Sequence, residues 1–159
     1  MADPATRSKA ATDVCRGVTR LFAQAGQTAI PEVPLPNGRR ADLLAIDAKG
    51  QVTIVEIKVS RADLHGDGKW PDYCGWCDRF YWALAAGLDP AILETEAYRP
   101  DMAGLIVADR HGAVVVREAA VEPIATARRK AEMLRLTRLA MRRLMIAADP
   151  DLAADWADG

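Results

Sequence analysis

The stretch from Gly38 to Ser60 decides the fold, and its centre reads RRADLLAID (39–47), AKG (48–50) and QVTIVEIK (51–58). The first and third segments are apolar and partly β-branched, which is typical of β-strands, and the short segment between them carries a glycine and a charge, as tight turns do. The sequence therefore predicts a β-hairpin. Three charged residues, Asp42, Glu56 and Lys58, interrupt its apolar runs.

Strand geometry brings these three charges together. Side chains alternate between the two faces of a strand, so Glu56 and Lys58 share a face. In a hairpin centred on Lys49, Asp42 lies opposite Glu56, and opposed residues have Cβ atoms roughly 4.5–5.5 Å apart. Two carboxylates at that separation repel each other, so a raised pKa, a neighbouring cation such as Lys58 or a bound metal must offset the repulsion. Mg²⁺ suits such a site because it binds through one or two carboxylates and keeps several waters.

A structural ion pair is the alternative to a metal site. Charged residues in strands usually lie on a solvated face or pair with each other. The flanking residues bear on the choice, because Leu44 and Ile54 share the face of the charges while Leu43 and Val55 fill the other face. Both faces are then covered, as in the central strands of an α/β sheet. Two carboxylates and a lysine at the end of such strands are a poor fit to ordinary solvated surface.

The composition is that of one globular domain. The chain has 159 residues, of which 50% are hydrophobic and 27% charged, with a net charge of -1. This total gives no support to nucleic-acid binding through overall charge, so the distribution of charge matters more. Three cysteines favour a reducing compartment. There is no apolar signal region and no run long enough to cross a membrane, so we expect a cytoplasmic protein without a membrane partner.

The predicted order of elements is helix, three strands, helix, two strands, helix (αβββαββα), which indicates an α/β fold with a mixed central sheet flanked by helices. Residues 1–10 are expected to be disordered, residues 11–148 to form a single domain and residues 149–159 an acidic tail. The expected elements are a helix from about 12 to 25, an edge strand over 28–35, the hairpin, a helix over 72–86, strands over 104–109 and 113–117, and a long helix from about 124 to 147.

Several residues near the hairpin are candidates to bind a nucleic acid. Residues 60–71 are predicted to form a loop that faces the substrate, since long loops in compact domains are often functional. In this loop Lys69 is a candidate to bind phosphate, and Trp70 either stacks on a base or pins the loop to the core. Arg39 and Arg40 either contact phosphate or lie on plain surface.

The last helix is basic on one side. Met133, Leu134, Met141, Leu144 and Met145 form the other, apolar side, and the arginines at 3.6-residue periodicity are Arg128, Arg135, Arg138 and Arg142. A charged helix face is usually just solvated. A helix face with charge of one sign over several turns lacks the (i, i+4) ion pairs that mixed charges form. The alternative interpretation is therefore that this face contacts the backbone phosphates of DNA.

Three further groups have weaker claims to a functional role. Asp13 is expected to be a charge at a helix N-terminus rather than a site residue. Glu32 either reaches the charged cluster or faces solvent. Cys74 and Cys77 have the spacing of a redox motif, but no strand is expected immediately before them, so we expect core cysteines.

Asp42, a short turn and then Glu56-Ile57-Lys58 resemble the signature of PD-(D/E)XK nucleases, with Ala41 where the name has Pro. The resemblance implies that Asp42 and Glu56 bind Mg²⁺ and that Lys58 helps to activate the attacking water. The Ile57 carbonyl is a further expected ligand, because sites of this type accept backbone oxygens. We expect Mn²⁺ to substitute for Mg²⁺.

A longer resemblance, to the bacterial MmcB-type DNA-repair proteins, covers most of the chain. It rests on Asp63, on the stretch 67–73 and on the stretch 77–81. It implies a restriction-endonuclease-like three-layer fold and a Mg²⁺-dependent DNA endonuclease that acts in repair. The alternative is a non-catalytic DNA-binding module on a nuclease fold within a repair complex. DNA is the expected partner, and both a homodimer and a second repair protein are left open.

Overall fold

The computed structural model describes residues 4–65 and 68–156, so Gly66 and Asp67 of the expected loop lie outside the described residues. A six-stranded mixed sheet forms its centre, and the strands follow one another in chain order. Pairing is antiparallel from the first to the third strand, parallel from the third to the fifth, and antiparallel again at the sixth. The strands are β1 (Thr28–Pro34), β2 (Arg40–Ile46), β3 (Val52–Lys58), β4 (Arg79–Ala85), β5 (Gly104–Ala108) and β6 (Ala113–Arg117).

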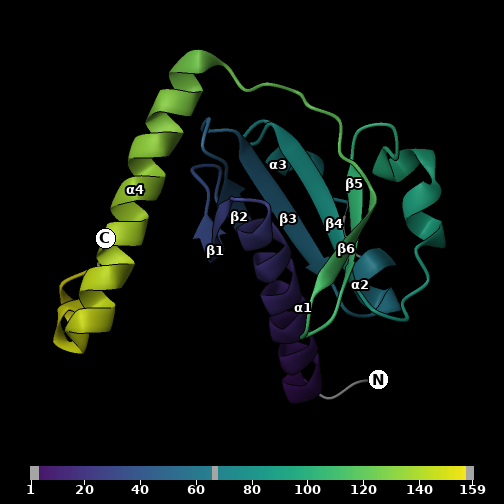
Figure 1. Ribbon diagram of the computed structural model, residues 1–159, viewed down its shortest axis with the longest axis horizontal. Helices are drawn as coiled ribbons and strands as arrows, with labels where there is room; N and C mark the ends of the chain where they lie inside the picture. Colours follow the sequence, from purple (N-terminus) through teal and green to yellow (C-terminus); the bar gives the residue numbers. More distant parts are fainter. Residues whose placement is uncertain (1–3, 66–67, 157–159) are drawn as a thin grey trace. The chain divides into compact units, whose positions relative to one another are not determined.

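One face of the sheet is covered by α1 (Pro4–Gln24), which Figure 1 shows lying across the strands. Val14, Val18 and Phe22 of this helix are buried against alternate residues of the strands, among them Leu43 and Val55. The sequence predicts disorder for residues 1–10, but the helix already includes residues 4–10. The alanines, arginine and lysine of that segment are strong helix formers, which extends the amphipathic helix toward the N-terminus.

Gly17 lets α1 approach the turn between β5 and β6 closely. A Cβ atom at this position would lie 2.1 Å from the carbonyl oxygen of Asp109 and 2.5 Å from that of Gly112. Three residues further along, Arg20 Nη1 donates a hydrogen bond to the carbonyl of His111 at 3.1 Å. The helix is thus fastened to this turn through its backbone contact and through one side chain.

The other face of the sheet carries an aromatic layer. Short helices, α2 (Arg61–His65) and α3 (Pro71–Cys74), connect β3 to β4, and two 3₁₀-helices, η1 (Ala91–Glu94) and η2 (Glu96–Tyr98), lie between β4 and β5. The rings in this layer contact one another with centroids 5.0 to 6.0 Å apart; they belong to Trp70, Tyr73, Phe80, Trp82 and Tyr98. The mixed sheet with helical segments on both faces is the α/β architecture that was predicted, and it is consistent with a restriction-endonuclease-like fold.

The predicted helix over 72–86 is wrong. Only Pro71–Cys74 is helical, and β4 occupies Arg79–Ala85. The apolar positions of this segment recur at three and four, but Phe80 to Leu84 are also continuously apolar and rich in aromatic residues, which is typical of a strand buried on both faces. The predicted loop over 60–71 likewise contains the helix α2. The sheet therefore has one strand more than the sequence predicts.

The chain divides into two compact units, residues 1–124 and residues 125–159, where the sequence predicts one domain over 11–148. The second unit consists of α4 (Thr126–Ala148) and a 3₁₀-helix, η3 (Pro150–Trp156), which contacts α4. The predicted acidic tail is therefore helical as far as Trp156. None of the helices in the described part of the chain is long and apolar enough to span a membrane.

Asp78 is a buried carboxylate that joins two segments of the first unit. Its two carboxylate oxygens accept the backbone N–H groups of Val52, at 2.7 Å, and of Ile124, at 3.0 Å. Its own carbonyl accepts the N–H of Glu122 at 2.8 Å. The start of β3 and the last residues of the first unit are therefore both held by this one residue.

Replacing Asp78 with alanine is expected to lower the free energy of unfolding by about 2 kcal/mol, because two buried N–H groups lose their acceptor. Urea denaturation monitored by circular dichroism measures the change. The matched control is Asp89→Ala, which removes an exposed carboxylate that accepts one N–H, from Ala91. The account of Asp78 is contradicted if the two substitutions cost the same.

Candidate functional site

The register of β2 and β3 places Asp42 and Glu56 next to each other at the end of the ladder. Leu43 pairs with Val55, so the residues one step further out are Asp42 and Glu56. This is the register that the sequence predicts with Lys49 at the centre of the hairpin.

The turn of the hairpin explains why this register is chosen. Asp47 Oδ1 accepts the backbone N–H groups of Lys49, at 2.8 Å, and Gln51, at 2.9 Å. Gly50 adopts a φ of 77°, a left-handed conformation that favours glycine. A slip by one residue would break these bonds and exchange the two faces of β3.

The three charged side chains of the hairpin form one cluster, which we call the acid–lysine cluster (Asp42, Glu56 and Lys58). Asp42 Oδ2 accepts the backbone N–H of Ile57 at 2.7 Å, and Lys58 Nζ lies 3.5 Å from Glu56 Oε1. Glu56 and Lys58 are each only 8% exposed. The arrangement thus keeps two acids and a cation together in a largely desolvated place.

Trp82 of β4 lies beside this cluster. It pairs with Glu56 in the parallel ladder, and the ammonium of Lys58 lies 5.7 Å from the centroid of its ring. That separation is within the range of a cation–π contact. Trp82 is not among the residues predicted for the site, because residues 72–86 are predicted to be a helix; a strand in their place puts Trp82 next to Glu56.

Burial raises the pKa of Asp42. The hydrogen bond from Ile57 and the charge of Lys58 oppose this rise, whereas the charge of Glu32 adds to it. Glu32 itself is exposed and forms an ion pair with Arg40, its Oε2 lying 2.6 Å from Arg40 Nε. It therefore faces solvent and also acts on the cluster through its charge.

The raised pKa of Asp42 predicts a pH-dependent effect of Asp42→Asn on stability. Ionised Asp42 is disfavoured in the folded protein, so the stability of the wild type falls as the pH rises from the ordinary range of aspartate through the raised pKa. Asparagine does not titrate, and its side-chain oxygen still accepts the Ile57 N–H. The free energy of unfolding of the variant therefore rises relative to that of the wild type across this pH window. The gain is about 1.4 kcal/mol for each unit by which folding raises the pKa of Asp42. Urea titrations in acid and at neutral pH measure this gain. The prediction is contradicted if the stability of the variant relative to the wild type is lower at neutral pH than in acid.

The ligand chemistry of the cluster fits a magnesium ion that keeps several waters. Asp42 and Glu56 offer carboxylate oxygens and Ile57 offers a backbone carbonyl, and Mg²⁺ is usually bound through only one or two carboxylates. Among the described residues no group of three or more His, Cys, Asp or Glu side chains is placed to hold a metal. A dedicated cage of protein ligands is therefore not what these residues form.

The candidate nucleic-acid contacts near the hairpin differ in their exposure and in their ion pairs. Arg39 is paired with Asp72, at 2.8 Å, and Arg40 with Glu32. Lys69 is exposed. Trp70 is only 4% exposed, and its Nε1 donates to the carbonyl of Ala97 at 3.3 Å. Its ring is therefore part of the aromatic layer, where it contacts Phe80 and Trp82, as expected for a residue that pins the loop to the core.

The four arginines of α4 that the sequence places at helical periodicity differ in exposure. Arg135 is half-buried and forms an ion pair with Glu132 at 2.6 Å, and Arg142 is also half-buried. Arg128 and Arg138 are exposed. Periodicity places residues on one side of a helix but does not fix how exposed each of them is, and here two of the four arginines are half-buried.

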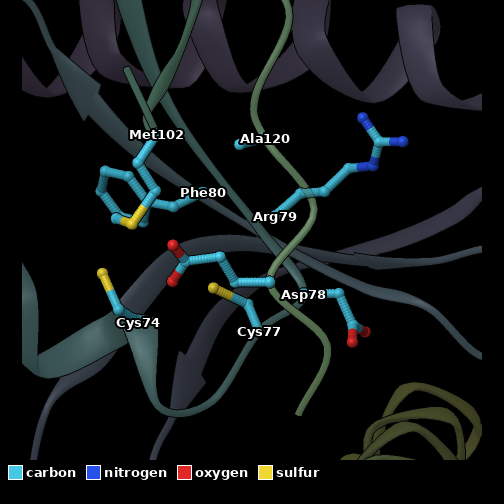
Figure 2. A pocket seen from close by; sticks show the side chains of 8 residues that line it. Cys74, Cys77, Asp78, Arg79, Phe80, Met102 and Ala120 are labelled. Atoms are coloured by element: carbon cyan, nitrogen blue, oxygen red, sulfur yellow. The ribbon is translucent and has the colours of Figure 1, made fainter. Parts of the chain in front are cut away.

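The structure also shows the surroundings of Asp13 and of the pair Cys74 and Cys77. Asp13 lies well inside α1, because the helix begins at Pro4, so it is not a charge at the helix N-terminus. Cys74 and Cys77 line a small cavity together with Phe80 and Met102, as Figure 2 shows. Burial raises the pKa of Cys74 to about 11 and raises that of Cys77 too. A redox motif needs a lowered thiol pKa, which is the opposite direction, and Cys77 is buried while Cys74 is half-buried.

Comparison with known proteins places the chain beside DNA-repair proteins. A family model described as "DNA repair protein MmcB-like" matches residues 2–151. A solved structure of a protein of unknown function from Silicibacter pomeroyi is 36% identical, covers 89% of this chain and 92% of its own, and superimposes with a TM-score of 0.79. The structure of SfsA from Pyrococcus furiosus in complex with Ca²⁺ is 16% identical over 65% of this chain and 59% of its own, with a TM-score of 0.35. No curated protein matches.

Proposed function

Because the chain belongs to the MmcB-like family of DNA-repair proteins, we propose that it is a Mg²⁺-dependent DNA endonuclease, which hydrolyses phosphodiester bonds in the cytoplasm during repair. The acid–lysine cluster is the observation that carries this proposal. It unites the two residue types that phosphodiester hydrolysis needs, carboxylates to hold a metal and a cation to meet the charge of the phosphate.

Each residue of the cluster has a role in this proposal. Asp42, Glu56 and the carbonyl of Ile57 would hold Mg²⁺, which Mn²⁺ would replace; when bound, the ion supplies a Lewis acid and lowers the pKa of a water. Lys58 donates a hydrogen bond to a non-bridging phosphate oxygen, where negative charge grows in the transition state. The hydrogen bond from Ile57 fixes the Asp42 carboxylate, so that this ligand is oriented before substrate arrives.

The DNA backbone would be held by cations around the cluster. Lys69 is exposed in the segment between β3 and β4, while Arg39 and Arg40 must release Asp72 and Glu32 to reach a phosphate. In the second unit the proposed contacts are Arg128, Arg135, Arg138 and Arg142. Arg128 and Arg138 are the more exposed of these. Such contacts position the duplex without reading its sequence.

A second candidate function is that of a DNA-binding module without catalysis. The observation that favours it is the ion pair between Lys58 and Glu56. This pair satisfies both charges within the protein, so the cluster has a structural explanation as well as a catalytic one.

A cleavage panel tests the proposal. Single-stranded, branched, nicked and damaged DNA are incubated with the wild type, Asp42→Asn and the surface control Asp89→Asn, in Mg²⁺, Mn²⁺ or chelator. We expect cutting that needs the metal, is lost in Asp42→Asn and persists in the control. Binding that weakens steeply with salt but without cutting would favour the module instead. Neither cutting nor binding would leave the cluster with a structural role alone.

A further inference from the structure

Helix α4 exposes a row of large apolar side chains, which we call the apolar stripe. Leu134, Met141 and Met145 follow one another at helical spacings of seven and four, so they lie on one side, and Leu144 borders them. Their exposed fractions are 63% for Leu134, 58% for Met141, 70% for Leu144 and 47% for Met145. Scattered apolar residues on a surface need no explanation, but a contiguous row on one helix is typical of a binding surface.

Helix α4 also has apolar residues on the side opposite the stripe. On the opposite side Glu132 and Leu136 are buried, and Leu139 and Ile146 are half-buried. The least exposed residues of α4 therefore lie on one side of the helix, and the apolar stripe lies on the opposite side. A helix that only needed to cover one surface would carry polar residues along the stripe.

The charges beside the stripe indicate what it binds. Lys130 and Arg138 are exposed and flank the stripe on the same side of the helix. The acid within α4 is Glu132, which is 2% exposed and paired with Arg135. The exposed side of α4 thus combines apolar side chains with positive charge. A partner with a complementary surface would combine apolar side chains with negative charge.

A second copy of the chain and a nucleic acid both fit the whole stripe less well, although Arg138 by itself is also a proposed phosphate contact. Arg138 lies near the middle of the stripe, so antiparallel pairing of two copies would bring the two Arg138 guanidinium groups together, and like charges repel. Phosphate groups would satisfy Lys130 and Arg138 but would leave the leucine and methionine side chains in water. A protein segment with apolar and acidic residues satisfies both parts of the surface.

We propose that the apolar stripe of α4 binds an acidic amphipathic helix of another protein. Its apolar side chains would pack on Leu134, Met141 and Met145, and carboxylates at its borders would meet Lys130 and Arg138. This is helix recognition through residues spaced by one or two turns. The methionines suit such a surface, since their unbranched side chains adapt to the partner.

Three model peptides test the proposal with the full chain. They are labelled helices with the same leucine positions and with Glu, Lys or Gln at every bordering position, and fluorescence anisotropy measures their binding. We expect the Glu peptide to bind at least about tenfold more tightly than the Lys peptide, and added salt to reduce this preference. Equal binding of the three peptides, or no binding of the Glu peptide, overturns the proposal.

Two variants locate the binding. Met141→Glu should weaken the Glu peptide at least about tenfold, because it places a carboxylate where an apolar contact forms. Arg138→Glu should shift preference toward the Lys peptide. Val114→Glu is the matched control, since Val114 is exposed to a similar extent, 66% against 58% for Met141, but lies on β6. Retained helix content confirms folding.

Light scattering completes the test. A wild type that is dimeric while Met141→Glu is monomeric would show that a second copy fills the stripe, which overturns the acidic partner. None of these measurements depends on DNA cleavage, so their outcome is separate from that of the proposed endonuclease function.

Discussion

Replacing Lys58 with methionine is expected to lower the rate of DNA cleavage by a factor of about 10² to 10³, measured under conditions in which circular dichroism shows the variant to be folded. The removal of one preorganised group that stabilises transition-state charge has about this effect in hydrolytic enzymes. Methionine keeps the length and apolar stem of lysine, and it can still pack on the ring of Trp82. Single-turnover cleavage of the substrate that the panel identifies measures the loss.

The loss should be specific to the buried lysine. Lys49→Met is the control, because Lys49 is exposed in the hairpin turn and should leave the rate unchanged. Glu56→Gln should show a comparable loss, since the amide is a poorer ligand for a hard cation than the carboxylate. If Lys58→Met cuts DNA at nearly the wild-type rate, the ion pair with Glu56 is structural and the catalytic assignment of Lys58 fails.

Replacing Gly17 with alanine is expected to lower the free energy of unfolding by more than about 3 kcal/mol. The added methyl group would overlap two backbone carbonyl oxygens, at 2.1 and 2.5 Å, and backbone atoms yield less readily than the end of a flexible side chain. Overpacking a close contact usually costs about 1–3 kcal/mol, and this contact is tighter than usual. The midpoint and slope of a urea titration give the change.

Gly112→Ala is the matched control for this prediction. Gly112 belongs to the turn that α1 approaches, but a Cβ atom there would have nothing within 4 Å. It should therefore change the stability by less than about 1 kcal/mol. A small effect of Gly17→Ala would mean that α1 can shift away from the turn at little cost, and the close approach would not be a determinant of the fold.

The hairpin was predictable from sequence because several local signals agree there. Two apolar runs define the strands, Asp47 and Gly50 define the turn between them, and the symmetry about Lys49 then places Asp42 beside Glu56. The proximity of Lys58 to Glu56 follows from strand alternation alone. The core of the candidate site is therefore a property of a short stretch of chain.

The remainder depends on tertiary structure, which local patterns do not contain. The segment around Phe80 and Trp82 has a helical period as well as a strand-like run, and only its position between two parallel strands decides the outcome. The burial of Trp70 depends on the same aromatic layer. On α4 the sequence defines the sides of the helix but not how exposed each residue on them is.

The order of the strands also has a consequence for the newborn chain. Because each strand pairs with the strands before and after it in sequence, a chain that leaves the ribosome N-terminus first can add strands to a growing edge one at a time, and none has to be inserted later between two others. Domains generally form as units in the direction of synthesis. The first three strands already contain Asp42, Glu56 and Lys58. The acidic ligands and the lysine are therefore expected to meet while the C-terminal half of the protein is still being translated.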